Sequence, residues 1–383
     1  MAAAASSAAR ITILGAGFAG LELSTQLSEA LGDRAQVTLI DQGEAFVFGY
    51  SKLDVMFGRT TLDAVRLPYS RFTKPGVRLL RESVQAIDPE TRRVTTDAGT
   101  HDCDYLVVAL GADYDIAATP GLADTNEFYT VAGANRLRDI LPSFSKGHAV
   151  VGVCGAPYKC PPAPSECVLM LHDMLMSRGV REQCEITLVL PLPSPVPPSP
   201  ETSKALIAAF AERGIRFMPN RRVKAVDAQR RVATLDDGSE LAWDLFLGVP
   251  RHHAPAVVRA AGMVAEDGFV PVNPRTLETR YPNVYACGDI ANTGTPKAGV
   301  FAEGAAKAVA SALIASIQGE GEAKLYGGAG TCYIEFGGGR IGRVDVDFFS
   351  GPKPTGSYHE PDVASRVHKE HFGASRKARW FGL

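Results

Sequence analysis

The segment Arg10-Ile-Thr-Ile-Leu14, followed by Gly15-Ala-Gly17-Phe-Ala-Gly20, decides the fold of this chain. The first five residues are a short β-branched run, which is typical of a buried parallel strand. The glycines follow at GxGxxG spacing, and a helical pattern continues to about Leu31. A second strand is predicted over residues 36–40 and ends at Asp41. A strand, glycine turn, helix and acidic residue in this order predict a dinucleotide-binding unit.

Each residue of this motif has a physical role. Gly15 permits the tight turn, Gly17 lets the backbone approach a pyrophosphate, and Gly20 allows close helix–strand packing. The helix N-terminus presents N–H groups to the phosphates, and Asp41 can accept hydrogen bonds from the adenosine ribose. The alternative is a glycine-rich turn without a ligand. The register of all four parts favours the nucleotide site.

Composition restricts the function classes. The chain has 383 residues, enough for two or three domains, and its 45% hydrophobic and 21% charged residues are ordinary for a globular protein. A net charge of −2 gives no electrostatic case for nucleic acid. The start lacks the features of a secretory signal and no apolar run reaches about 18 residues, so we expect a cytoplasmic protein. The seven cysteines have no zinc spacing, so we expect thiols or redox pairs and no metal.

Two further motifs concern the cofactor. Residues 280–293 contain Gly288-Asp289 and are followed by Pro-Lys297-Ala-Gly299 and a predicted helix, while residues 105–112 form a strand and a turn at Gly111. With the first motif, they resemble the FAD fingerprints of the pyridine nucleotide–disulfide oxidoreductase superfamily. The resemblance implies that the helix after Gly299 aims its N-terminus at the flavin. The FAD-binding residues implied are Gly15, Gly17, Gly20, Asp41, Val84, Gly111, Gly288, Asp289, Lys297 and Gly299.

An internal repeat predicts the domain organisation. Residues 84–88 and 104–109 recur as residues 223–227 and 244–248, about 139 positions later. We therefore expect an α/β fold with two tandem Rossmann-like three-layer domains, the second inserted into a discontinuous FAD domain, and a small C-terminal region. The predicted limits are 1–112 and 250–330 for the FAD domain, 113–249 for the second domain and 331–383 for the C-terminal region.

The second domain lacks the pattern of a nicotinamide site. Its first strand, residues 149–153, runs into Cys154-Gly-Ala-Pro-Tyr-Lys-Cys-Pro-Pro162, whose prolines at 157, 161 and 162 remove N–H donors that phosphates need. The next strand ends at Pro191 instead of an acidic residue or an arginine. We expect that electrons do not come from NAD(P)H.

The cysteine loop narrows the function. Residues 156–166, with Cys160 and Glu166, resemble the cysteine loop of flavocytochrome c sulfide dehydrogenase and sulfide:quinone oxidoreductases, and Cys332 resembles the position of the partner cysteine. The resemblance implies that sulfide attacks a Cys160–Cys332 disulfide, yielding zero-valent sulfur or polysulfide, and that electrons pass through FAD to a quinone. Lys159 would favour the thiolate, and Glu166 is the candidate general base. Residues 46–52 lack the cysteine of members with covalent flavin, so we expect non-covalent FAD.

The acceptor side depends on the C-terminal region. Tyr333, Phe336 and Phe348 are the aromatic candidates for stacking on a quinone. The tail, residues 362–383, is basic and ends in Trp380-Phe381, which suits an interfacial segment on the cytoplasmic face of a membrane; a terminal helix packed on the protein is equally compatible. The sequence leaves open whether the chain forms a homo-oligomer.

Two other functions fit the same fold. One is an NAD(P)H-dependent quinone or ferredoxin reductase, which the prolines of the second domain disfavour. The other is a flavin-bound redox regulator, which would keep FAD but would not need Cys160. Reduction of the flavin by sulfide or by NADH distinguishes these functions.

Overall fold

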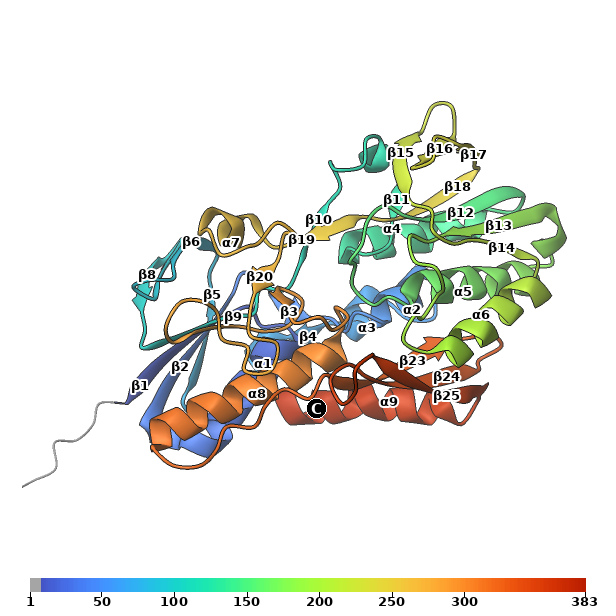
Figure 1. Ribbon diagram of the computed structural model, residues 1–383. Helices are drawn as coiled ribbons and strands as arrows, with labels where there is room; N and C mark the ends of the chain where they lie inside the picture. The colour runs from blue at the N-terminus through green and yellow to red at the C-terminus, as the bar shows by residue number, and fades with distance from the viewer. Residues whose placement is uncertain (1–7) are drawn as a thin grey trace, which may run out of the picture.

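The computed structural model describes residues 8–383, which form two α/β units with a C-terminal sheet and helix packed across them (Figure 1). The first seven residues, on which the expectation of no secretory signal partly depends, lie outside the described part. Among residues 8–383, no group of three or more His, Cys, Asp or Glu could hold a metal ion.

The first unit is built around the strand that precedes the glycine motif. Its parallel sheet has the order β5 (Val77–Arg81), β2 (Ala35–Asp41), β1 (Ala9–Leu14), β9 (Tyr105–Val108) and β21 (Val284–Ala286). Side chains alternate across the sheet because successive strand residues point to opposite faces. Ile11 and Ile13 pack with α1 (Phe18–Leu31) and α8 (Gly299–Gln318). Leu14 packs on the other face with residues of β6 (Val84–Asp88), β7 (Arg93–Thr96) and α7 (Ala256–Ala260).

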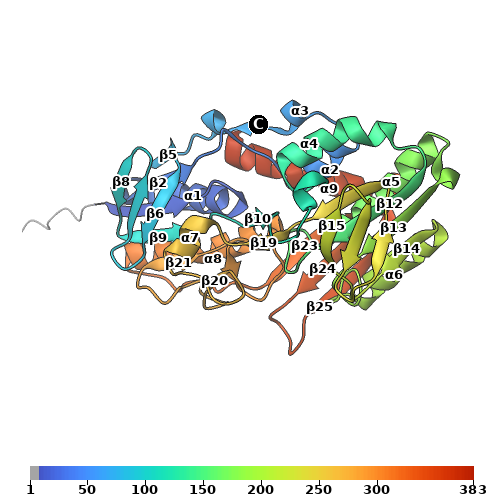
Figure 2. The same cartoon turned by 90° about the horizontal axis from the view of Figure 1, so that it is seen from above.

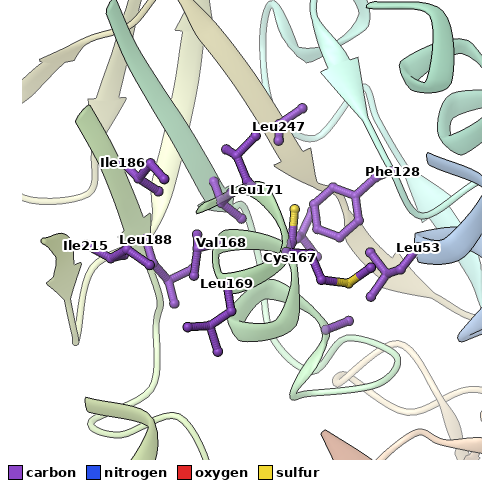
Figure 3. Close-up of a cluster of buried hydrophobic side chains, with 14 of the residues drawn as sticks. Leu53, Phe128, Cys167, Val168, Leu169, Leu171, Ile186, Leu188, Ile215 and Leu247 are labelled. Carbon is purple, nitrogen blue, oxygen red and sulfur yellow. The ribbon is translucent and has the colours of Figure 1, made fainter. Parts of the chain in front are cut away.

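The second unit repeats this plan. Its parallel sheet has the order β11 (Asn126–Glu127), β18 (Leu245–Val249), β12 (Gly147–Val153), β13 (Cys184–Val189) and β14 (Ile215–Met218). Helices α4 (Val131–Ile140), α5 (Ala163–Ser177) and α6 (Pro200–Glu212) accompany it. Figure 3 shows Val168 and Leu171 of α5 against Leu188 and Leu247 of the sheet, with Cys167 in the same apolar cluster. Cys167 is therefore a core residue.

The internal repeat corresponds to two antiparallel sheets of three strands. β6, β7 and β8 (Gly99–Asp102) form one, and β15 (Val223–Asp227), β16 (Val232–Leu235) and β17 (Glu240–Ala242) form the other. The turns agree in backbone conformation as well, because Arg92 and Arg231 both have a positive φ, 56° and 53°. The predicted fold of two Rossmann-like three-layer domains is thus confirmed.

Two short strands connect the units. β10 (Asp113–Asp115) and β19 (Arg251–His253) pair antiparallel, and Figure 2 shows them between the two parallel sheets. The predicted domain limits at 112/113 and 249/250 remain a prediction. The other short elements are β3 (Ala45–Phe46), α2 (Ser51–Met56), α3 (Leu62–Val65), β4 (Leu67–Pro68), β20 (Val270–Pro271) and β22 (Ala291–Asn292).

The C-terminal region joins both units. The antiparallel strands β23 (Ala329–Glu335), β24 (Ile341–Asp347) and β25 (Thr355–Asp362) are followed by α9 (Ser365–Arg376). β23 contacts α5 of the second unit and α8 of the first, and α9 runs beside β24 and β25 (Figure 1). The strand that carries Cys332 is therefore held between the two units.

One described helix is long and apolar enough to cross a membrane by length and composition. It is α8, and half of its apolar window is buried inside the protein, where the helix packs along α1. Glu303 of this helix forms ion pairs with Lys307 and Arg376. These contacts are those of a core helix.

Candidate active site

A cavity of about 370 Å³ lies where the two units meet the C-terminal region. Gly17 and Phe18 at the start of α1 line it, together with Gly288 and Gly299 of the second fingerprint. The predicted cysteines, Cys160 and Cys332, and Glu166 line the same cavity. Motifs from three distant parts of the chain thus surround one cavity.

The glycines of the first fingerprint have different surroundings. A Cβ on Gly15, where φ is +100°, would lie 2.4 Å from the Ala109 carbonyl oxygen, and one on Gly20 would lie 1.9 Å from the Gly15 carbonyl oxygen. Gly17 has no atom within 4 Å of that position, and it begins α1 without a side-chain cap. Gly15 and Gly20 are therefore needed for chain packing, whereas Gly17 leaves the room that a pyrophosphate needs.

Asp41 and Val84 lie outside the cavity wall. The Asp41 carboxylate accepts hydrogen bonds from the N–H groups of Ala16 and Gly43, both at 2.7 Å, which fixes it at the end of β2. Each carboxylate oxygen keeps a further acceptor site, as a ribose hydroxyl needs. Val84 begins β6 opposite Thr96, and its contact with FAD remains a prediction.

The second fingerprint supplies a second helix N-terminus. Ala298 and Gly299 line the cavity where α8 begins, again without a side-chain cap. Asp289 lines the cavity as well; desolvation raises its pKa, and the charge of Lys297 acts in the opposite direction. Lys297 Nζ donates to the Asp289 carbonyl oxygen at 2.7 Å, and burial lowers the lysine pKa to about 8. Gly111 also lines the cavity.

The cavity fits FAD. A dinucleotide cofactor with a flavin needs one free helix N-terminus for its pyrophosphate and gains from a second one beside the ring. The N-terminus of α1 is available for the pyrophosphate and that of α8 for the flavin ring, because neither has a side-chain cap. Gly17, at the start of α1, leaves open space beside the backbone.

Cys160 and Cys332 face the same cavity. Cys160 precedes α5 in a left-handed backbone conformation with φ 51°, and its N–H donates to the Lys297 carbonyl oxygen at 2.7 Å. Cys332 lies in β23 opposite Val344. Both are free thiols, and a negative charge on Cys332 acts to raise the pKa of Cys160. Desolvation raises the pKa of both thiols, that of Cys332 to about 12, and the charge of Glu166 acts in the same direction.

Lys52 is the lysine whose charge is among the main influences on Cys160, whereas the effect of Lys159 on the thiolate, although that lysine also lines the cavity, remains a prediction. Lys159 Nζ donates to the Ala112 carbonyl oxygen at 2.8 Å, and its charge is not among the main influences on Cys160. Lys52, at the start of α2, donates to the Tyr129 carbonyl oxygen, and its charge lowers the pKa of Cys160. Burial lowers the pKa of Lys52 itself to about 8.

Glu166 lies in the first turn of α5 and lines the cavity beside both cysteines. Its Oε1 accepts the N–H of Glu335 at 3.0 Å. Burial raises the Glu166 pKa to about 7, while the charge of Lys369 acts to lower it. A carboxyl group that titrates near neutral pH beside two thiols has the properties of a general base.

The aromatic wall differs from the prediction for two of its three residues. Tyr333 lines the cavity. Phe336 is buried in the core against Gly342, and Phe348 packs edge-on against Phe301, so neither is among the described residues that line the cavity. Phe336 follows the end of β23, and Phe348 follows the end of β24. Tyr50 and Phe372 are among the other aromatic residues that line the cavity.

The tail is packed on the first unit. Trp380 and Phe381 are only 1% and 6% exposed, and Trp380 Nε1 donates to Glu22 at 2.9 Å. Arg379 forms ion pairs with Glu22 and Glu29 at 2.9 and 3.1 Å. The aromatic end of the tail is therefore part of the core, as the packed-helix alternative expects, and an interfacial role of the rest of the tail remains a prediction.

Sequence reasoning missed Lys52, Lys369 and Phe372, which all line the cavity. Lys52 lies in the segment that is notable in sequence for its lack of a cysteine. Lys369 and Phe372 are three residues apart on a helix and so share one face, which is a signal that the sequence does contain.

Comparisons with known proteins extend these findings. The sequence pattern of the family described as "Pyridine nucleotide-disulphide oxidoreductase" matches residues 9–315. The mitochondrial sulfide:quinone oxidoreductase of Mus musculus is 22% identical over 90% of this chain and 79% of its own length. The sulfide-quinone reductase of Aquifex aeolicus is 25% identical over 86% of this chain and 82% of its own length.

Solved structures show the same fold. The sulfide:quinone oxidoreductase from Aquifex aeolicus superposes with a TM-score of 0.86 at 23% identity, covering 97% of this chain and 92% of that one. The resemblance found in the sequence is thus confirmed, and the protein is an FAD-binding flavoprotein and an oxidoreductase. With a match over most of its length, the chain belongs to the pyridine nucleotide-disulphide oxidoreductase family.

Proposed function

We propose that this protein oxidises sulfide to zero-valent sulfur or polysulfide and passes the electrons through FAD to a quinone. The observation that carries the proposal is the position of Cys160 and Cys332 on one cavity with the N-termini of α1 and α8. The relatives named sulfide:quinone oxidoreductase support it, because they match this chain over most of its length.

The chemistry begins with a Cys160–Cys332 disulfide. HS⁻ attacks one sulfur, the S–S bond breaks, and the products are a persulfide on one cysteine and a thiolate on the other. Release of the outer sulfur as S⁰ then re-forms the disulfide and sets free one proton and two electrons. The bound FAD supplies the two-electron acceptor. With a quinone Q the sum is HS⁻ + Q + H⁺ → S⁰ + QH₂.

The neighbouring charged groups assist this sequence. Lys52 stabilises the thiolate of Cys160, since its ammonium lowers the pKa of that thiol. Glu166 accepts the proton that sulfide loses, because its pKa of about 7 keeps a large carboxylate fraction at neutral pH. Both residues line the same cavity as the two cysteines.

The acceptor would meet the aromatic part of the cavity. Tyr50, Tyr333 and Phe372 line it, and Val131 at its edge is 36% exposed. An apolar ring system gains from stacking on such side chains. Contact with the membrane that holds the quinone remains a prediction, as does the cytoplasmic location.

Anaerobic reduction tests the function. Sulfide should bleach the flavin absorbance rapidly and stoichiometrically, whereas NADH and NADPH should not. Reoxidation by a soluble quinone analogue should then follow, and a sulfur product should be recovered. Absence of bleaching by sulfide at micromolar concentration would exclude the proposal.

A second function has one observation in its favour. The type II NADH:quinone oxidoreductase of Staphylococcus saprophyticus is 32% identical over 117 residues, which is 30% of this chain. Against an NADH site, Arg251 packs on Gly155 so closely that a Cβ there would lie 3.1 Å from the arginine side chain. Bleaching by NADH in the same experiment would establish this second function.

A further inference from the structure

The C-terminal helix places a lysine inside the redox cavity. Lys369 of α9 lines the cavity together with Cys160, Cys332 and Glu166. Its Nζ donates to Glu335 Oε1 at 2.7 Å, and the two side chains are only 14% and 6% exposed. A charge-assisted hydrogen bond between two largely buried groups is short and strong, so it holds the lysine ammonium beside Glu335.

Glu335 connects this lysine to Glu166. Its backbone N–H donates to Glu166 Oε1 at 3.0 Å, so β23 holds both carboxylates in one place. The Glu335 side chain also pairs with Arg59 Nη1 at 3.2 Å, and Arg59 lies 3.5 Å from Asp54. The side chain of Glu335 therefore pairs with Lys369 and Arg59, and its backbone N–H binds the Glu166 carboxylate.

We propose that Lys369 is a positioning residue that keeps the Glu166 carboxylate charged beside the two cysteines, with Glu335 holding the lysine in place. The meaning of this charge for catalysis rests on the proposed function, but the electrostatic relationship does not. Lys369 thereby makes the C-terminal helix a part of the active site.

The charges around Glu166 support this assignment. Lys369 from α9 has the largest effect of its charged neighbours and lowers the pKa of Glu166, whereas Glu335 from β23 and Asp54 from α2 raise it. Other titratable groups that interact with Glu166 include the thiols of Cys160, Cys167 and Cys332 and the phenol of Tyr129. Without the lysine, burial and the neighbouring acids would raise the Glu166 pKa further.

Lys369 is suited to a permanent charge. The carboxylates of Glu166 and Glu335 raise its pKa, although burial alone would lower it. Its ammonium group therefore stays protonated throughout the range in which Glu166 titrates. The lysine acts on the glutamate and does not itself exchange the proton.

The test compares substitutions that should shift the titration midpoint of the Glu166 carboxyl in opposite directions. In the purified holoprotein, the protonated carboxyl band of Glu166 in the infrared, identified by its loss in Glu166→Gln, gives the titration midpoint. Lys369→Met should raise this midpoint by about 1 pH unit or more, Lys369→Arg should restore it, and Glu335→Gln should lower it. The pH profile of sulfide-driven bleaching should move in the same directions relative to the unchanged protein.

The matched control is Lys377→Met, which removes the same charge from the same tail at a residue that is not among those lining the cavity. Its midpoint should equal that of the unchanged protein. The assignment would be overturned if the Glu166 midpoint shifted equally in all variants, the control included. It would also be overturned if Lys369→Met kept its flavin and showed no shift of the midpoint. If sulfide fails to reduce the flavin, the proposed function is wrong, yet the infrared titration still decides the role of Lys369.

Discussion

The N–H of Cys160 donates a hydrogen bond of 2.7 Å to the carbonyl oxygen of Lys297. This bond joins the cysteine loop of the second unit to the segment that begins α8 in the first unit. It also supports a left-handed backbone at Cys160, a conformation that costs a residue with a side chain free energy and persists where the surroundings hold it. The redox loop is therefore held against the cofactor fingerprint by the main chain.

The two cysteines should be equally necessary. Cys160→Ala and Cys332→Ala should each reduce sulfide-driven bleaching by more than about 100-fold while the protein keeps its FAD, because a disulfide needs both sulfurs. Stopped-flow absorbance measures the loss. Cys184→Ala, which changes a buried thiol at the start of β13, is the control and should bleach normally. Activity in Cys332→Ala would show that another thiol is the partner of Cys160.

Lys52 and Lys159 should differ in their effect on Cys160. Lys52→Met removes a charge that lowers the Cys160 pKa, so the thiolate fraction at neutral pH should fall. Alkylation of Cys160 in the reduced protein, followed by mass spectrometry, should slow by about tenfold for each pKa unit gained. Lys159→Met should leave this rate unchanged. Equal slowing in both variants would mean that Lys159 acts on the thiol as well.

The glycines of the first fingerprint should separate folding from cofactor binding. Gly20→Ala should destabilise the protein by about 3 kcal/mol, because its Cβ would meet the Gly15 carbonyl oxygen at 1.9 Å. Gly17→Ala should leave stability without the cofactor nearly unchanged, since that position is open, but should weaken FAD binding. Urea unfolding and flavin titration of the apoprotein measure the two effects. Full FAD affinity in Gly17→Ala would place the pyrophosphate elsewhere.

The tail should contribute stability. Trp380→Ala should cost about 3–5 kcal/mol in the free energy of unfolding, because the ring is 1% exposed and packs edge-on against Phe18 and Phe46. Leu383→Ala, at a residue that is 48% exposed, should change stability by less than about 0.5 kcal/mol. Chemical unfolding compares the two. A loss of binding to anionic vesicles in Trp380→Ala without loss of stability would restore the interfacial role.

FAD should be bound without a covalent bond. Residues 46–52, which lie beside the cavity, contain no cysteine. Acid precipitation should therefore release all of the flavin into the supernatant, where its absorbance is measured. Flavin that remained with the precipitated protein would point to an attachment residue of another type.

Much of the fold could be predicted because its determinants are local. Ile11, Ile13 and Leu14 already show the alternation that places side chains on both faces of β1. Gly15 and Gly20 are required by contacts within one strand–turn–helix unit, so a short segment of sequence contains the whole reason for them. The repeat of residues 84–88 at 223–227 likewise predicts two similar sheets.

The site was predictable where a residue's role follows from its place in a motif, and not where it depends on the direction of a side chain. Lys159 is adjacent to Cys160 in sequence, yet it reaches the Ala112 carbonyl oxygen, while Lys52 from another unit acts on the thiol. Phe336 follows Glu335 just after the end of β23, and its side chain is buried in the core.

By itself, the sequence determined the two-unit fold, the FAD fingerprints and the candidate cysteines, since each of these depends on neighbours within a few turns or strands. Only the tertiary structure decided which charged and aromatic groups surround the cysteines. Electrostatic effects act through space over a few ångströms, and Lys52, Glu166 and Lys369 come together because α2 packs against α4, β23 against α5, and α9 against β24. No short sequence pattern predicts that these three residues lie close together.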